Sequence, residues 1–282
     1  MPSTSAPVVP SAPSSVPSVP LTSLHDRAEL AGRFGRDPEL HLFELGDLDE
    51  PFWSHTAWYT TSSDGPVALL YTVGEVPTLL GLARPERTGE LAGLLRAMRP
   101  VLPRRLLAHL TDGGLDALAP DFRAEHRTAM LRMALTDRTA LAPHLGRGTG
   151  PVTPLGAADL PDLLALFAAG YPGNWFDERM LTTGPYVGVR DDAGRLIATA
   201  GVHVSSPERR VAVIGNITTH PEARRRGLAA ACTAHLCHLL TQRGTAHIGL
   251  NVRADHPTAL PLYRRLGFTT VAPYDEVALT AP

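Results

Sequence analysis

Residues 214–229 read IGNITTHPEARRRGLA and carry the strongest structural signal in the chain. The apolar start predicts a buried strand, and the Leu- and Ala-rich sequence after it predicts a long helix over about 227–243. The N–H groups of the turn between them, with the positive end of the helix dipole, can hold a pyrophosphate. Gly227 lets the backbone approach a phosphate without an intervening Cβ, and three adjacent arginines add positive charge. The pattern predicts an anion-binding strand–turn–helix unit.

A second motif follows at residues 250–268, which read LNVRADHPTALPLYRRLGF. Together and in this order, the two motifs resemble the signatures of the GCN5-related N-acetyltransferase (GNAT) superfamily, in which a Gln/Arg-x-x-Gly-x-Gly/Ala turn holds the pyrophosphate of acetyl-CoA. The resemblance covers about residues 150–282, and YPGNWF at residues 171–176 resembles the FR47-like branch. It implies the family fold, with acetyl-CoA as co-substrate and no metal.

The resemblance also implies roles for individual residues. The backbone of residues 217–219 would pair with the pantetheine arm, and one N–H group there would polarise the thioester carbonyl. Tyr263 would protonate the departing CoA thiolate; the alternative is a buried core aromatic. The cofactor-binding residues implied are Ile217, Thr218, Thr219, Arg224, Arg225, Arg226, Gly227, Leu228, Ala229, Ala230, Asn251 and His256.

The second motif departs from the family pattern at two positions. His256 stands where the family usually has Asn, which weakens the cofactor contact implied there. Pro261 interrupts a helix, which in a helix interior costs roughly 3 kcal/mol. With Thr258 as the N-cap, Pro261 falls at a position whose N–H has no partner within the helix anyway. We therefore expect this helix to begin near Thr258.

Candidates for binding and activating an acceptor are less specific. His203 has an unperturbed pKa of about 6.5 and could deprotonate an amine, although a strand histidine with satisfied hydrogen bonds explains it equally well. Glu178 is a weaker candidate base, and Asn216 could hold a water or a substrate amide. The substrate-pocket wall is predicted to include Tyr171, Trp175, Phe176 and Asn216, with core packing as the alternative for the aromatic rings.

The length of 282 residues suggests two domains. We expect a disordered Ser/Pro-rich tail at 1–20, an N-terminal domain at 21–141, a Gly/Pro-rich linker at 142–152 and a catalytic domain at 153–282. The predicted strands are 40–45, 57–61, 67–73, 77–83, 105–110, 128–135, 186–190, 196–204, 210–218, 247–252 and 276–279, and the predicted helices are 90–102, 115–119, 157–168, 227–243 and one ending at Leu266.

The two halves show a similar order of elements, which suggests an internal duplication. Residues 84–89 precede the long helix of the first half, where the anion-binding turn would lie. Arg87 takes the place of the glycine there, and its side chain would obstruct a phosphate. We therefore predict that the first half is a degenerate, non-catalytic GNAT-like copy that packs against the catalytic domain and helps to shape the acceptor cleft.

Composition restricts the class of protein. The hydrophobic fraction is 44% and the formal charge is −2, which fits a globular protein and argues against a nucleic-acid binder. No apolar run approaches the ~20 residues of a membrane span. Both cysteines, Cys232 and Cys237, lie in the predicted long helix and point to different faces, so neither a disulfide nor a metal site is expected and a cytoplasmic location fits. All 26 basic residues are arginine, because the sequence contains no lysine.

The sequence thus predicts an α/β (α+β) protein whose mixed, mostly antiparallel sheet is flanked by helices. The predicted function is transfer of an acetyl or short acyl group from acetyl-CoA to an amine, by direct attack in a ternary complex. A small molecule or a peptide would provide the amine, and a homodimer is compatible with the sequence. The alternative is a non-enzymatic acyl-CoA sensor or partner-binding module. A nucleotide-binding P-loop is disfavoured because no Gly-Lys-Ser/Thr motif is present.

Overall fold

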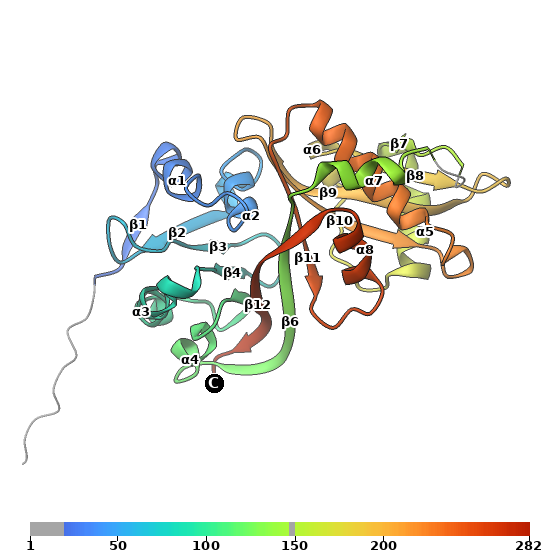
Figure 1. The fold of residues 1–282 in the computed structure, drawn as a ribbon. Helices are drawn as coiled ribbons and strands as arrows, with labels where there is room; N and C mark the ends of the chain where they lie inside the picture. The colour runs from blue at the N-terminus through green and yellow to red at the C-terminus, as the bar shows by residue number, and fades with distance from the viewer. Residues whose placement is uncertain (1–19, 147–149) are drawn as a thin grey trace, which may run out of the picture.

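The computed structural model describes residues 20–146 and 150–282, and its strands form one continuous sheet of twelve (Figure 1). The strand order is β1-β2-β3-β4-β5-β12-β6-β11-β10-β9-β8-β7. The strands are β1 (Thr22–Leu24), β2 (Thr56–Thr60), β3 (Ala68–Tyr71), β4 (Thr78–Gly81), β5 (Arg105–Leu110), β6 (Arg123–Leu135), β7 (Thr153–Leu155), β8 (Tyr186–Arg190), β9 (Leu196–Ser206), β10 (Val211–Thr219), β11 (His247–Arg253) and β12 (Phe268–Thr280).

Helices cover both faces of this sheet. The α-helices are α1 (Arg27–Phe34), α2 (Leu42–Gly46), α3 (Thr88–Met98), α4 (Gly114–Leu118), α5 (Leu160–Gly170), α6 (Met180–Thr183), α7 (Leu228–Gln242) and α8 (Ala259–Arg265). Apolar residues of α3 and α4 pack on one face of the first half, and those of α7 and α8 pack on one face of the second. Residues of α1 and α2, and of α5 with Met180 of α6, form separate core clusters on other strand residues. The expected mixed, mostly antiparallel sheet flanked by helices is confirmed.

The second half repeats the element order of the first. Each half runs strand, two helices, three strands, helix, strand, helix, strand. In each half the third of the three strands pairs in parallel with the strand after the long helix, β4 with β5 and β10 with β11, whereas the other pairings are antiparallel. The element order supports the predicted duplication.

The last strands of the two halves are exchanged. β6 ends the first half but pairs with β11 of the second, and β12 ends the second half but pairs with β5 of the first. β6 and β12 also pair with each other along most of their length, and Figure 1 shows them side by side at the centre of the molecule. Residues 21–141 and 153–282 therefore share their central strands and do not form two separate sheets.

Local patterns predicted most elements correctly. The predicted strands 105–110 and 186–190 match β5 and β8, and Thr258 is the N-cap of α8 as expected. The predicted strand at 40–45 is wrong, because residues 42–46 form helix α2. Short apolar runs fit both helix and strand, and here Leu42 and Leu45 share the buried side of a helical turn.

The segment between the halves is partly helical. A 3-10 helix spans Arg138–His144, so the first residues of the predicted linker are helical. Residues 1–19 of the predicted tail and 147–149 of the predicted linker lie outside the described residues.

Candidate functional site

The parallel strands β10 and β11 pair for only part of their length. Val211, Ala212 and Val213 are in register with His247, Ile248 and Gly249, and no later pair joins the two strands, although both continue and both are fully described. The register between β10 and β9 shifts between Gly215 and Thr218, and Asn216 has a φ of 50°. Such a bulge bends the strand and strengthens its twist. The backbone of residues 217–219 therefore borders the opening between the two strands.

The end of β10 leads into a turn whose backbone suits anion binding. Arg225 and Gly227 have φ angles of 63° and 79°, and a Cβ on Gly227 would meet no atom within 4 Å. No side chain caps the N-terminus of α7. The N–H groups at the start of a helix have no partner within it, so those of Leu228, Ala229 and Ala230 remain as donors.

The three arginines of the turn are exposed. Arg224 donates through Nη2 to the carbonyl oxygen of Gly170 at 3.2 Å. In the described parts of the chain, neither Arg225 nor Arg226 forms an ion pair or a side-chain hydrogen bond. Their charges therefore add to the positive end of the α7 dipole and favour a phosphate group there.

Tyr263 lies on α8, which begins after its N-cap Thr258. The side chain is only 8% exposed, and its ring centroid is 6.0 Å from that of Phe268. Burial raises the pKa of Tyr263 well above its ordinary value, and nearby Tyr171 and Cys237 add to the effect. The phenol is therefore protonated at neutral pH and can act as a proton donor.

Two predicted cofactor-binding side chains are engaged within the protein. Asn251 accepts a hydrogen bond at Oδ1 from Nε of Arg132, at 3.3 Å. His256 accepts at Nδ1 from the backbone N–H of Ala259, at 3.2 Å, and so caps the start of α8. Any contact that these two residues make with a cofactor would use other atoms or a rearranged side chain.

His203 lies on the opposite face of the sheet from α7. Its ring packs over Gly215, where a Cβ would come within 2.3 Å of Nε2, and Trp175 approaches it edge-on at 6.0 Å. Nε2 is buried and has no hydrogen-bond partner. Burial lowers the pKa of His203, and Asn216 partly opposes this shift. The imidazole is therefore neutral at neutral pH and can accept a proton.

The other predicted pocket residues differ in exposure. Asn216 is buried, donates through Nδ2 to Oη of Tyr186 at 2.9 Å and accepts from Nδ2 of Asn174 at 3.3 Å. It thereby attaches the 171–176 turn to β10. Phe176 packs on Phe167 and Tyr186 in a core cluster, so core packing explains its ring. By contrast, Trp175 is 59% exposed, and Tyr171 and Glu178 are also exposed.

In the corresponding turn of the first half, the arginines form ion pairs with carboxylates. Arg84 binds both carboxylate oxygens of Asp37, at 2.6 and 2.8 Å, and Arg87 pairs with Glu90 at 2.7 Å. Arg87 itself is the N-cap of α3, where the second half has Gly227. This arrangement supports the predicted degenerate copy.

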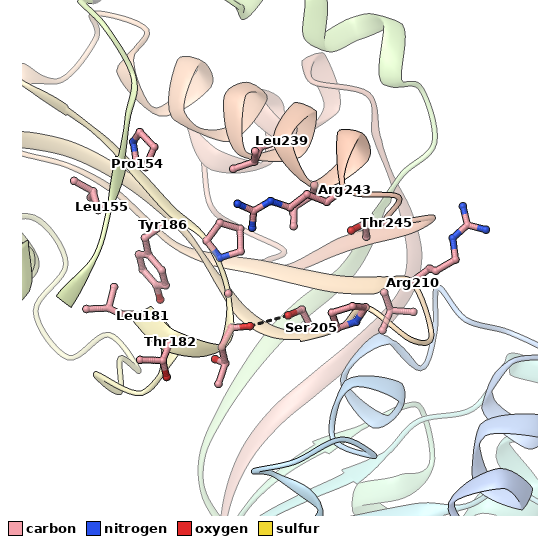
Figure 2. Close-up of a pocket in the computed structure, with 16 residues that line it drawn as sticks. Pro154, Leu155, Leu181, Thr182, Tyr186, Ser205, Arg210, Leu239, Arg243 and Thr245 are labelled. Carbon is pink, nitrogen blue, oxygen red and sulfur yellow. Dashed lines mark hydrogen bonds between the residues drawn. The ribbon is translucent and has the colours of Figure 1, made fainter.

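A pocket of about 440 Å³ lies at the other end of α7, around its C-terminal residues (Figure 2). In Figure 2, Leu239 of α7 and Arg243, which directly follows the helix, lie above Tyr186. Ser205 donates a hydrogen bond to the carbonyl oxygen of Thr183 at 3.0 Å. This pocket contains none of the predicted cofactor-binding residues.

Both cysteines of α7 are buried and free. Burial raises the pKa of Cys232 to about 12 and that of Cys237 to about 12. A thiol with such a pKa carries almost no thiolate at neutral pH, so neither is suited to be a nucleophile. Across residues 20–146 and 150–282, no group of three or more His, Cys, Asp or Glu side chains is placed to hold a metal ion.

None of the site residues predicted from the sequence lies in the first half of the chain. The structure packs α2 against β9 and β10 and buries Glu44, Asp47 and Arg132 near the β10–β11 opening. Acidic residues flanked by leucines in a short apolar run are the signal that could have indicated this. Their location depends on the exchange of β6 and β12, which no local pattern encodes.

Comparison with known proteins identifies the second half. Residues 160–268 match the family model described as the acetyltransferase (GNAT) family. Mycothiol acetyltransferase of Clavibacter michiganensis is 36% identical over 98 residues, which cover 35% of this chain and 29% of that protein. The ribosomal protein bS18 alanine N-acetyltransferase of Escherichia coli is 39% identical over 75 residues, 27% of this chain and 49% of that protein. The chain thus spans less than half the length of these curated relatives.

Solved structures resemble nearly the whole chain. A Drosophila protein has a TM-score of 0.67 at 14% identity and covers 93% of this chain and 98% of its own. A GCN5-related N-acetyltransferase-like protein from Streptococcus suis has a TM-score of 0.53 at 17% identity, and the match covers 90% of this chain and 100% of that protein. At these identities the likeness shows the fold alone, and it includes both halves.

The second half of the chain, residues 160–268, is therefore a GNAT acetyltransferase domain. Within residues 20–146 and 150–282, no helix is both long and apolar enough to cross a membrane.

Proposed function

We propose that this chain transfers an acetyl or short acyl group from acetyl-CoA to an amine, by direct attack within a ternary complex. The observation that carries the proposal is the opening between β10 and β11. It leads directly to the uncapped N-terminus of α7 and its three exposed arginines. An extended pantetheine arm needs an open strand, and a pyrophosphate needs N–H donors at one end of it.

Each group has a defined part in this reaction. The backbone of residues 217–219 pairs with the pantetheine arm, and one N–H group there polarises the thioester carbonyl. Residues 224–230 hold the pyrophosphate. The amine attacks the carbonyl carbon, the C–S bond breaks, Tyr263 gives its proton to the leaving thiolate, and the nitrogen releases one proton as the amide forms. Because its pKa is raised, Tyr263 still carries that proton at neutral pH.

The acceptor is a small-molecule or peptide amine. One relative is named for mycothiol and the other for an alanine of ribosomal protein bS18, so both kinds of acceptor occur among the relatives. Exposed Trp175 beside His203 provides an aromatic surface for either kind.

The test is amine-dependent release of free CoA. Purified protein would be incubated with acetyl-CoA and a panel of amines: an alanine-initiated hexapeptide, glucosamine, spermidine and kanamycin. The proposal expects CoA release that requires an amine and yields its acetylated product by mass spectrometry. Tight acetyl-CoA binding without release for any amine would instead favour the non-enzymatic sensor.

A further inference from the structure

Several polar side chains are buried between α2 and the central strands. Arg132 of β6 is 1% exposed, and its guanidinium contacts the carbonyl oxygen of Leu40, Oε2 of Glu44 at 3.5 Å and Oδ1 of Asn251 at 3.3 Å. Its Nη2 has no partner, nor has the buried hydroxyl of Tyr274, whose ring lies beside the guanidinium. Buried polar atoms are normally hydrogen-bonded, so a cluster of unpaired ones indicates a place where a polar ligand or water binds.

Two carboxylates of this cluster differ in their partners. Glu44 is 1% exposed and lies 3.2 Å from Nδ1 of His41 and 3.5 Å from Arg132. Burial alone would raise the pKa of Glu44, but His41 and Arg132 lower it. Asp47 is 7% exposed, no ion pair joins its carboxylate to a cation of the described ranges, and its oxygens are not among the fully enclosed unpaired atoms there, so they still reach the surface. Burial disfavours the ionised form of a carboxylate, and Asp47, unlike Glu44, has no cation within ion-pair distance in the described ranges.

Contacts place Asp47 close to the β10 bulge. The preceding residue, Gly46, packs so tightly on Val204 of β9 that a Cβ there would lie 2.6 Å from Cγ2 of the valine. Val204 is in register with Val213 of β10, two residues before Gly215, on which the His203 ring rests. Asp47 therefore lies near the point where β10 separates from β11.

Charged and titratable groups face Asp47 from several elements. Burial raises the pKa of Asp47 well above its ordinary value, Glu44 adds to this shift and Arg132 opposes it. Tyr71, at the end of β3, interacts electrostatically with Asp47 and also with Asp177 and Arg179, which follow the aromatic turn of the second half. Tyr71 thus lies between Asp47 and two charged residues of the second half.

We propose that Asp47, supplied by the first half of the chain, binds the ammonium group of the acceptor and accepts its proton. This inference rests on the proposed function and assigns a catalytic role to the half that lacks the cofactor site. One N–H bond of the ammonium breaks and its proton moves to the Asp47 carboxylate. The freed nitrogen lone pair then attacks the thioester carbonyl carbon, the C–S bond breaks and the thiolate takes the proton of Tyr263. The nitrogen releases its second proton as the amide forms, and the Tyr263 phenolate regains a proton from water.

An amine would also resolve the unpaired state of Asp47. An ammonium donates to a carboxylate in a charge-assisted hydrogen bond, which is stronger than a neutral one. A base works best when its pKa lies near the working pH, and burial moves Asp47 in that direction. Glu44 is already paired with His41 and Arg132, so Asp47 is the carboxylate of this cluster that is left to bind a cation.

The test compares Asp47→Asn, Asp47→Glu and the control Asp64→Asn, with the amine of the panel that wild type acetylates fastest. Asp64 is a carboxylate of the same half whose side chain is 84% exposed. We expect Asp47→Asn to lower kcat by about 100-fold or more, with acetyl-CoA affinity unchanged by calorimetry. The rise of kcat/KM with pH should disappear in this variant, Asp47→Glu should restore part of the rate, and the control should match wild type.

The outcomes separate the two proposals. If wild type acetylates no amine, the proposed function fails first. If wild type is active and Asp47→Asn keeps its rate and pH profile, the role of Asp47 is refuted while the enzyme assignment stands. If His203→Gln removes the pH dependence and Asp47→Asn does not, the base is His203. Unchanged acetyl-CoA affinity in each variant shows that the protein is folded.

Discussion

Replacing Gly227 tests whether charge at the start of α7 holds the cofactor. A Cβ at this position would meet no atom within 4 Å, so Gly227→Ala creates no clash. The residue has a φ of 79°, and that conformation costs a non-glycine residue about 1–2 kcal/mol. This cost lowers the stability of the folded protein and leaves the affinity for acetyl-CoA nearly unchanged, because the same backbone conformation is present with and without the cofactor. We expect a lower melting temperature and an acetyl-CoA affinity within about tenfold of wild type.

Gly227→Glu adds a negative charge to the same backbone. Two unit charges about 4 Å apart interact by roughly 4 kcal/mol at an effective dielectric constant near 20. At about 1.4 kcal/mol per tenfold, repulsion between the carboxylate and the pyrophosphate should weaken binding by roughly a thousandfold. The alanine variant serves as control for the change of backbone conformation.

Titration calorimetry with acetyl-CoA measures both variants, and melting curves show whether each is folded. A Glu variant that binds acetyl-CoA like wild type would refute the placement of the pyrophosphate at this turn. Equal losses for the Ala and Glu variants would show that backbone conformation, and not charge, controls binding.

Three further predictions follow from burial and hydrogen bonding. Tyr263→Phe should lower kcat by about 100-fold without changing acetyl-CoA affinity, and a wild-type rate at every pH would assign the proton to another donor. Asn216→Ala removes the hydrogen bonds to Tyr186 and Asn174 and should destabilise the fold by about 1–3 kcal/mol in urea unfolding; an unchanged midpoint would contradict this. Asp47→Asn should raise the melting temperature at pH 8, because the folded state raises the pKa of Asp47 and its ionised form therefore opposes folding. The gain should vanish below about pH 3, where Asp47 is mostly protonated in both states, and a gain that is the same at about pH 3 and at pH 8 would exclude ionisation as its cause.

The turn and helix that we propose to bind the cofactor could be predicted from the sequence, because the residues that define them are close together in the chain. Gly227 and the helix after it are adjacent in the chain, and the α8 boundary at Thr258 follows from the position of Pro261. Backbone geometry and helix dipoles act over a few residues, so short motifs define them.

The acceptor side depends on contacts between distant segments. β6 pairs with β11, and β12 pairs with β5, more than 100 residues away along the chain. No periodicity in either strand indicates this exchange, which brings Arg132 beneath α2. The incorrect strand prediction at 40–45 includes Glu44 and ends two residues before Asp47. For this reason the sequence did not indicate that helix α2 brings these two carboxylates to the same site. Sequence patterns therefore indicated the turn that we propose to bind the cofactor, and did not indicate the residues that the first half brings close to it.

Hydrogen exchange with and without acetyl-CoA tests the location of the cofactor most directly. We predict slower exchange at the backbone N–H groups of residues 217–219 and 228–230, and no change in the equivalent residues 84–94 of the first half. Protection confined to residues 84–94, or to the pocket at the C-terminal end of α7, would contradict the assignment of the β10–β11 opening as the acetyl-CoA site.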